Sequence, residues 1–118
     1  MIPQHWQPHY RDQDDELTGY LVPGAEPGTV VPVTLFGYPL AEAGDEDDAA
    51  GVLDARGLSV LADRWYLHAD GADPVRVSIV EVTPQRVVVQ GFDYGAIDID
   101  VQRYEFDNPV PEGILRLR

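Results

Sequence analysis

The stretch from Arg64 to Gln102 alternates apolar and polar residues over most of its length, and no other feature of the chain constrains the fold as strongly. Such alternation is typical of strands that bury one face. Three groups of turn-forming residues interrupt it, at Asp70–Pro74, Thr83–Gln85 and Asp93–Gly95. The stretch therefore predicts four consecutive antiparallel strands, a meander that the rest of the chain covers or extends.

One pairing register places the large apolar residues of all four predicted strands on a common face. The cross-strand pairs in that register are Ala69–Val75, Leu67–Val77, Trp65–Ile79, Val82–Arg86, Ile79–Val89, Val89–Ile99 and Val87–Val101. A slip of one residue in any hairpin would turn its apolar residues to the other face. The agreement between hairpins therefore supports the meander.

The second face of the predicted sheet mixes polar and apolar side chains. It carries Arg64, Tyr66, His68, Arg76, Ser78, Val80, Val82, Arg86, Val88, Asp98 and Asp100. A face in contact with water does not need three valines, so one explanation is that the helix or the N-terminal hairpin covers it, or that the sheet curls into a small barrel. The other explanation is an exposed apolar patch that binds a partner.

A hairpin is predicted ahead of the meander. Leu17–Val22 and Thr29–Phe36 have strand-like composition, and the residues between them are rich in proline and glycine. Pro32 has no N–H to donate, which favours an edge position for the second strand.

One short helix is predicted at about 46–56. Asp45 can cap its first turn, the acidic residues that follow suit the helix dipole, and Gly57 stands where the helix should end. Residues 58–63 fit either a short helical turn or the start of the first meander strand, because a short apolar run does not distinguish the two.

These elements predict an α+β fold that is mainly antiparallel β. The expected organisation is an irregular N-terminal arm over residues 1–16 and a single globular domain over residues 17–118. The order of a helix followed by a four- to five-strand meander is similar to that of SH3-like and Sm-like small barrels, although no motif of those families is present.

Composition excludes several classes of function. The chain has a formal net charge of −13, contains no cysteine, and has only arginine among its basic residues. Disulfides, thiol catalysis and lysine Schiff bases are therefore excluded, and a nucleic-acid partner is disfavoured. No apolar run approaches the roughly 20 residues that span a bilayer, so we expect no membrane partner and a cytoplasmic location.

The strongest cluster of reactive side chains lies on the second face of the meander. The predicted register makes His68 and Arg76 cross-strand neighbours and places Tyr66 opposite Ser78. An arginine can hold an anion, and a histidine can transfer a proton near neutral pH. These four residues are the candidate ligand-binding site, with ordinary solvated sheet residues as the alternative.

Other groups of polar residues do not predict catalysis or a metal site. His5 and His9 would share one face of a helix, but Pro8 lies between them. The adjacent carboxylates of Asp45–Asp48 lack the alternating spacing of a calcium loop. We therefore expect no catalytic residue, no metal and no cofactor.

The sequence favours a non-enzymatic protein–protein interaction module. An inhibitor or immunity-type protein that neutralises a basic partner would use this acidic charge, and its partner-binding candidates are Val80, Val82, Val88, Asp98 and Asp100. The alternative is a small-molecule binding protein or enzyme with its site at Tyr66, His68, Arg76 and Ser78. A homodimer that covers the valine patch is a third possibility.

Overall fold

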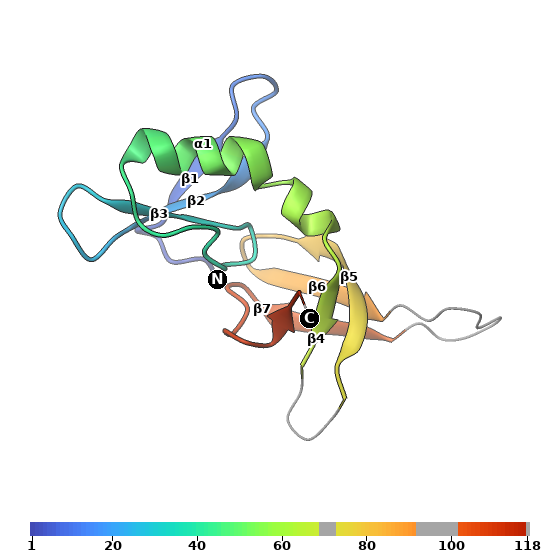
Figure 1. The fold of residues 1–118 in the computed structure, drawn as a ribbon. Coiled ribbons are helices and arrows are strands. Elements are labelled where there is room, and N and C mark those ends of the chain that lie inside the picture. The colour runs from blue at the N-terminus through green and yellow to red at the C-terminus, as the bar shows by residue number, and fades with distance from the viewer. Residues whose placement is uncertain (69–72, 92–101, 118) are drawn as a thin grey trace.

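The computed structural model of this chain describes residues 1–68, 73–91 and 102–117. Within them, the protein has the predicted α+β class, with two antiparallel sheets and an α-helix (Figure 1). One sheet has three strands in the order β1-β2-β3, and the other has five in the order β7-β6-β5-β4-β8. The elements are β1 (Gln7–Tyr10), β2 (Leu17–Pro23), β3 (Val30–Val33), α1 (Glu46–Arg56), the 3-10 helix η1 (Ser59–Ala62), β4 (Trp65–Leu67), β5 (Val75–Val82), β6 (Arg86–Gly91), β7 (Arg103–Asp107) and β8 (Leu115–Arg116).

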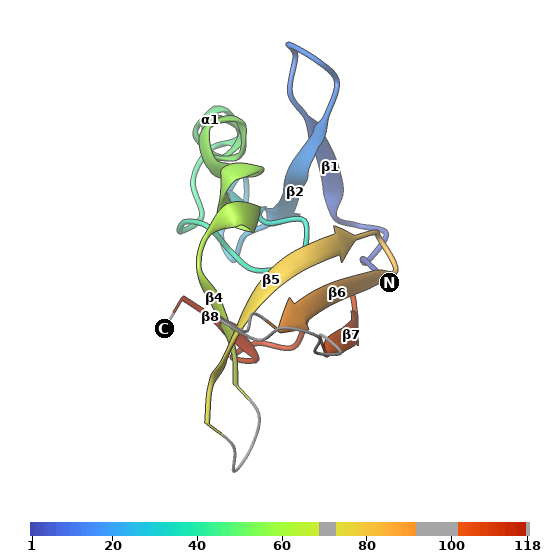
Figure 2. The ribbon, with the colours of Figure 1, turned by 90° about the vertical axis from the view of Figure 1, so that its right-hand side faces the viewer.

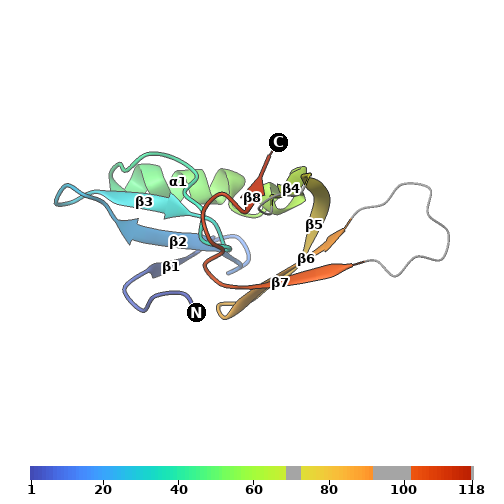
Figure 3. The same cartoon turned by 90° about the horizontal axis from the view of Figure 1, so that it is seen from below.

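Helix α1 packs on one face of the three-stranded sheet (Figure 3). Its buried residues Ala49 and Leu53 meet Leu21 of β2. The helix begins as the sequence predicts, because a side-chain oxygen of Asp45 accepts a hydrogen bond from the backbone N–H of Asp48 at 2.8 Å. The predicted hairpin is confirmed as β2 and β3, and the ambiguous residues 58–63 adopt the helical alternative as η1.

The first sixteen residues differ from the expected irregular arm. Residues 7–10 form β1, which pairs with β2, and only the flanking segments are outside regular structure. Ile2 is buried, and its N–H donates to the carbonyl oxygen of Pro84 at 2.9 Å. The N-terminal segment therefore contacts the turn between β5 and β6 (Figure 2).

The first three strands of the predicted meander are confirmed as β4, β5 and β6, and β7, which lies beyond the predicted stretch, continues the sheet as it curls into a half-barrel (Figure 2). Its concave side holds the main core, which contains Phe36, Val60, Trp65, Leu67, Val77, Val87, Val89, Val110 and Leu115. The last strand, β8, does not extend the meander but crosses back to pair with the free edge of β4.

The predicted register of the first meander hairpin is wrong by two residues. Leu67 pairs with Val75 and Tyr66 with Arg76, whereas Leu67 was expected opposite Val77. The side-chain period of a strand is two, so a two-residue shift leaves every side chain on its predicted face. The pattern of apolar residues therefore could not detect it.

The second hairpin confirms one predicted pair and corrects another. Ile79 lies opposite Val89 as expected, but Val82 pairs with Val87 rather than Arg86. A β-bulge between Ile79 and Glu81 inserts the extra residue. Bulges add one residue to one strand and shift the faces beyond them.

The third predicted pairing is also wrong. Val87 and Val89 pair with Phe106 and Tyr104 of β7, so they are not opposite Val101 and Ile99. Those last two residues lie outside the described part of the chain. The apolar residues at 97, 99 and 101 made that segment a plausible strand, and the pattern at 104 and 106 was equally suitable.

The Asn108 side chain is one of the groups that tie the two sheets together; the Tyr38 hydroxyl, which donates to the Pro111 carbonyl oxygen at 2.7 Å, is another. The Asn108 amide nitrogen donates to the carbonyl oxygens of Leu35, after β3, and Thr83, after β5, at 2.8 Å each. Phe36 follows Leu35 and inserts into the half-barrel core, where its ring meets Trp65 edge-on at 5.2 Å between centroids. The N-terminal part of the chain, residues 1–56, therefore contributes a core residue to the five-stranded sheet.

Replacing Asn108 tests this junction. Asn108→Ala leaves two carbonyl oxygens without their donor, and we expect it to lower the free energy of unfolding by about 2–4 kcal/mol. Urea denaturation measures the change, with Gln102→Ala at an exposed position as the control. Equal stability of the two variants would contradict the role of Asn108.

Two glycines of the helical region provide a matched pair. Gly51 is exposed within α1 and has open space around it, whereas a methyl group on Gly57 would collide with the carbonyl oxygens of Thr18 and Leu53. Gly57 has an ordinary helical backbone, so close packing and not a left-handed conformation requires glycine there.

We expect opposite effects from the same substitution at these two positions. Gly51→Ala should stabilise the protein by about 0.5–1 kcal/mol through helix propensity, and Gly57→Ala should destabilise it by about 1–3 kcal/mol through overpacking. Thermal or urea unfolding gives both values, and a stabilising Gly57→Ala would show that α1 does not pack this closely on β2.

Candidate functional site

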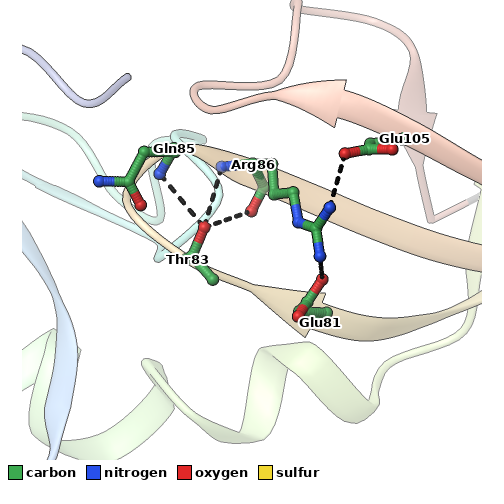
Figure 4. Close-up of polar contacts among 5 residues, drawn as sticks. All are labelled: Glu81, Thr83, Gln85, Arg86 and Glu105. Atoms are coloured by element: carbon green, nitrogen blue, oxygen red, sulfur yellow. Dashed lines mark hydrogen bonds and ion pairs between the residues drawn. The ribbon is translucent and has the colours of Figure 1, made fainter.

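The outer, convex face of the five-stranded sheet carries a network of ion pairs centred on Arg86 (Figure 4). The Arg86 guanidinium contacts the Glu81 carboxylate at 2.8 Å and the Glu105 carboxylate at 2.9 Å. Glu105, by its hydrogen bond, and then the charge of Glu81 raise the pKa of Arg86. Because two carboxylates already surround this cation, the network is poorly suited to capture an anionic ligand.

The turn that precedes Arg86 fixes its position. The Thr83 hydroxyl accepts hydrogen bonds from the backbone N–H groups of Gln85 and Arg86, at 3.3 and 3.1 Å (Figure 4). This side chain closes the β5–β6 turn in the manner expected for a threonine at the start of a turn. Arg86 therefore starts β6 beside Glu81 and Glu105 on the neighbouring strands.

A hollow of about 420 Å³ lies on the same face. It is lined by Val80, Glu81, Arg86, Val88, Arg103 and Glu105. Val80 is 46% exposed, whereas Val88 is buried beneath its neighbours. The valine patch expected from the sequence is thus partly present, but charged side chains form most of its rim.

The other predicted partner-binding residues do not join this patch. Val82 packs against the core on the concave side, because the bulge after Ile79 turns it away from Val80. The expectation that Val80 and Val82 share the outer face is therefore wrong. Asp98 and Asp100 lie outside the described residues.

The four candidate ligand-binding residues are rearranged by the register shift. Tyr66 lies opposite Arg76 on one side and Arg116 of β8 on the other, and Ser78 lies opposite Gln90. The expected pairs His68–Arg76 and Tyr66–Ser78 are therefore wrong. His68 follows the end of β4, where its N–H donates to the Ile114 carbonyl oxygen at 2.7 Å.

Arg116 is a cross-strand neighbour of Tyr66 that sequence reasoning missed. The two residues are fifty positions apart, and the contact arises because β8 returns to the edge of β4. Recognising it would have required knowing which edge the last strand joins, which the apolar pattern does not specify.

Exposed carboxylates are most concentrated at the start of α1, away from the face that carries Arg86. Asp45–Asp48 are exposed, and Glu26 and Glu42 line a nearby hollow of about 300 Å³. The β2–β3 loop meets the segment before α1 because Val30 and Gly44 form an isolated antiparallel bridge. This bridge brings together carboxylates that are distant in sequence.

Two further features bear on the class of site. Within the described residues, no group of three or more histidine and carboxylate side chains is arranged to hold a metal ion. Among the helices described, none is long and apolar enough to cross a membrane.

Aspartate substitutions at two neighbouring valines test the bulge that shapes this face. We expect Val82→Asp to cost about 2–3 kcal/mol, because it places a carboxylate in a half-buried position against the core. Val80→Asp should change stability by about 1 kcal/mol or less, because the side chain points outward. Urea unfolding compares the two, and similar losses would contradict the bulged register.

No protein-family model, curated protein or solved structure matches this chain. The functional inference therefore depends on the surface of the molecule itself.

Proposed function

We propose that this chain is a non-enzymatic protein–protein interaction module that binds a basic partner, in the manner of an inhibitor or immunity-type protein. The observation that carries the proposal is the uneven distribution of charge. Residues 1–56 contain eleven of the 21 acidic residues but two of the eight basic ones. Residues 57–118 hold the other ten acidic and six basic residues.

The two arginines of residues 1–56 do little to offset the negative charge of this part of the chain. Arg11 is engaged by Asp14, with its Nε donating to Oδ1 at 2.7 Å, and Arg56 lies in the last turn of α1, away from the acidic first turn. Glu26, Glu42 and Asp47 are exposed at the opposite end of the helix. This end of the molecule therefore presents carboxylates to solvent.

A clustered acidic surface acts on a basic partner in two ways. It steers the diffusional encounter and so raises the association rate, and it fixes orientation by excluding partners of like charge. Both effects weaken as salt screens the charges. The hollow at this end, about 300 Å³ and lined by Glu26 and Glu42, is at the small end of the range for small-molecule sites.

Neutralisation of the acidic end tests the proposal. The partner is first isolated by affinity capture from the native host's lysate at low salt and eluted with high salt. We then expect the triple variant Glu26→Gln, Glu42→Gln, Asp47→Asn to bind the captured basic protein about tenfold more weakly, with a shallower salt dependence. Titration calorimetry at several salt concentrations measures both effects.

A variant with the same net charge provides the control. Asp63→Asn, Asp73→Asn and Glu112→Gln remove three exposed carboxylates from residues 57–118, and we expect this variant to keep its affinity within about twofold. Capture of no basic protein, or equal loss of affinity in both variants, would contradict the proposal.

A further inference from the structure

The three-stranded sheet is covered on one face by α1 and on the other by the short N-terminal segment. Helix α1 covers the face that carries Leu21, while Tyr20 points to the opposite face. That opposite face is met by Ile2 and Trp6 of the N-terminal segment, and Leu17 and Val22 on it are only half-buried. The cover is therefore partial, and it leaves apolar side chains around the small core of Ile2, Tyr20 and Val33 in reach of a partner.

An apolar groove of about 320 Å³ lies on this second face, beside the N-terminal segment. Its walls include Trp6, Pro8, Tyr10, Leu17, Tyr20 and Pro84. Trp6 and Tyr20 lie with their ring centroids 6.0 Å apart, and Tyr10 is 54% exposed. The groove thus presents three aromatic rings between proline residues, and the β5–β6 turn contributes Pro84 to its wall.

The three rings also offer unused hydrogen-bond donors. Neither the Trp6 indole N–H nor the hydroxyls of Tyr10 and Tyr20 have a hydrogen-bond partner within the described residues. Tyr20 is only 4% exposed, and burial, with a smaller contribution from Tyr10, raises the pKa of its hydroxyl. Tyr20 therefore keeps its proton at neutral pH and can donate it to a carbonyl oxygen of a bound chain.

The edge of β1 does not favour a partner that adds a strand. β1 has four residues, its register shifts between His9 and Tyr10, and Pro8 has no N–H to offer at the edge. Recognition must therefore come from the side chains of the groove. Aromatic-lined grooves with donors on their rings suit polyproline II segments, which are already extended and expose their carbonyl groups.

The acidic residues beside the groove indicate which residues should flank the prolines of a bound segment. The β1–β2 loop begins next to Tyr10 and ends next to Leu17, and it carries the exposed residues Asp12, Asp15 and Glu16. Asp14 in the same loop is paired with Arg11. A basic residue beside the prolines of a bound segment would therefore find carboxylates at the end of the groove.

We propose that this groove binds a proline-rich segment of a partner protein in the polyproline II conformation, with an arginine or lysine beside the prolines lying against the β1–β2 loop. The proposal deepens the proposed function and depends on it, because it assigns the basic partner a chemical class and a docking site.

The fluorescence of Trp6 can report binding in the groove without an added label. Of its two tryptophans, Trp6 lines the groove, whereas Trp65 is 5% exposed and donates its indole N–H to the Val60 carbonyl oxygen. We would titrate the whole chain with three synthetic peptides and follow tryptophan emission. One peptide has a proline-rich centre with arginine flanks, the second has the same centre with glutamate flanks, and the third has alanines in place of prolines with arginine flanks.

The first peptide should bind at least about fivefold more tightly than either of the others, because only it matches both the groove and the loop. The alanine peptide can form a helix and carries the same charge. If it binds as tightly as the first peptide, the groove accepts a helix or responds to charge alone, and the proposal is overturned. Equal binding of the glutamate-flanked peptide would overturn the role of the loop.

Two substitutions locate the binding to the groove. We expect Tyr10→Ala to weaken binding of the first peptide about tenfold, and Tyr20→Phe to weaken it about threefold or more by removing one donor. Leu117→Ala and Tyr66→Phe, both outside the groove, are the matched controls and should leave the affinity unchanged. Circular dichroism establishes that each variant is folded, and a Tyr10→Ala variant that binds normally contradicts the assignment.

The outcomes separate this inference from the proposed function. If no peptide binds but the captured basic protein still depends on the acidic end, the groove proposal fails and the interaction module stands. If sedimentation shows a dimer that dissociates in Tyr10→Ala, the groove is occupied by a second copy of the chain, and the peptide proposal is overturned.

Discussion

The docking of the two sheets, in which the Asn108 amide and the Phe36 ring take a central part, is the constraint on which the rest of the structure depends. Asn108 satisfies carbonyl groups from both parts of the chain at once, and Phe36 carries the N-terminal part into the core of the half-barrel. Each sheet alone is small and has a face that its own residues do not cover. Loss of the Asn108 donors would leave the two carbonyl oxygens unsatisfied, which costs free energy, whereas the Asn108 Oδ1 itself is buried with no hydrogen-bond partner among the described residues.

The sequence predicted the elements of this fold better than their connections. Alternation located β4, β5 and β6 and assigned nearly every side chain to a face, and the Asp45 cap located the start of α1. Alternation has a period of two, so it could not detect the two-residue shift that places Val75 opposite Leu67. It also contains no information on the bulge near Val80 or on the edge that β8 joins.

The candidate binding surfaces were harder to predict from the sequence, because segments that are far apart along the chain form them. Trp6 and Tyr10 stand in a polar, proline-containing stretch whose order comes from contacts with β2 and with the turn at Pro84. Glu26 and Glu42 come together only through the bridge between Val30 and Gly44. In each case the information lies in tertiary contacts and not in a local pattern of residues.

The position of the β5–β6 turn has a consequence for the energetics of the whole chain. Thr83 accepts the hydrogen bond from Asn108, and the adjacent Pro84 both accepts from Ile2 and forms a wall of the aromatic groove. The groove is therefore complete only while the two sheets are docked. A ligand that needs the wall at Pro84 would favour the docked arrangement and raise the midpoint of unfolding.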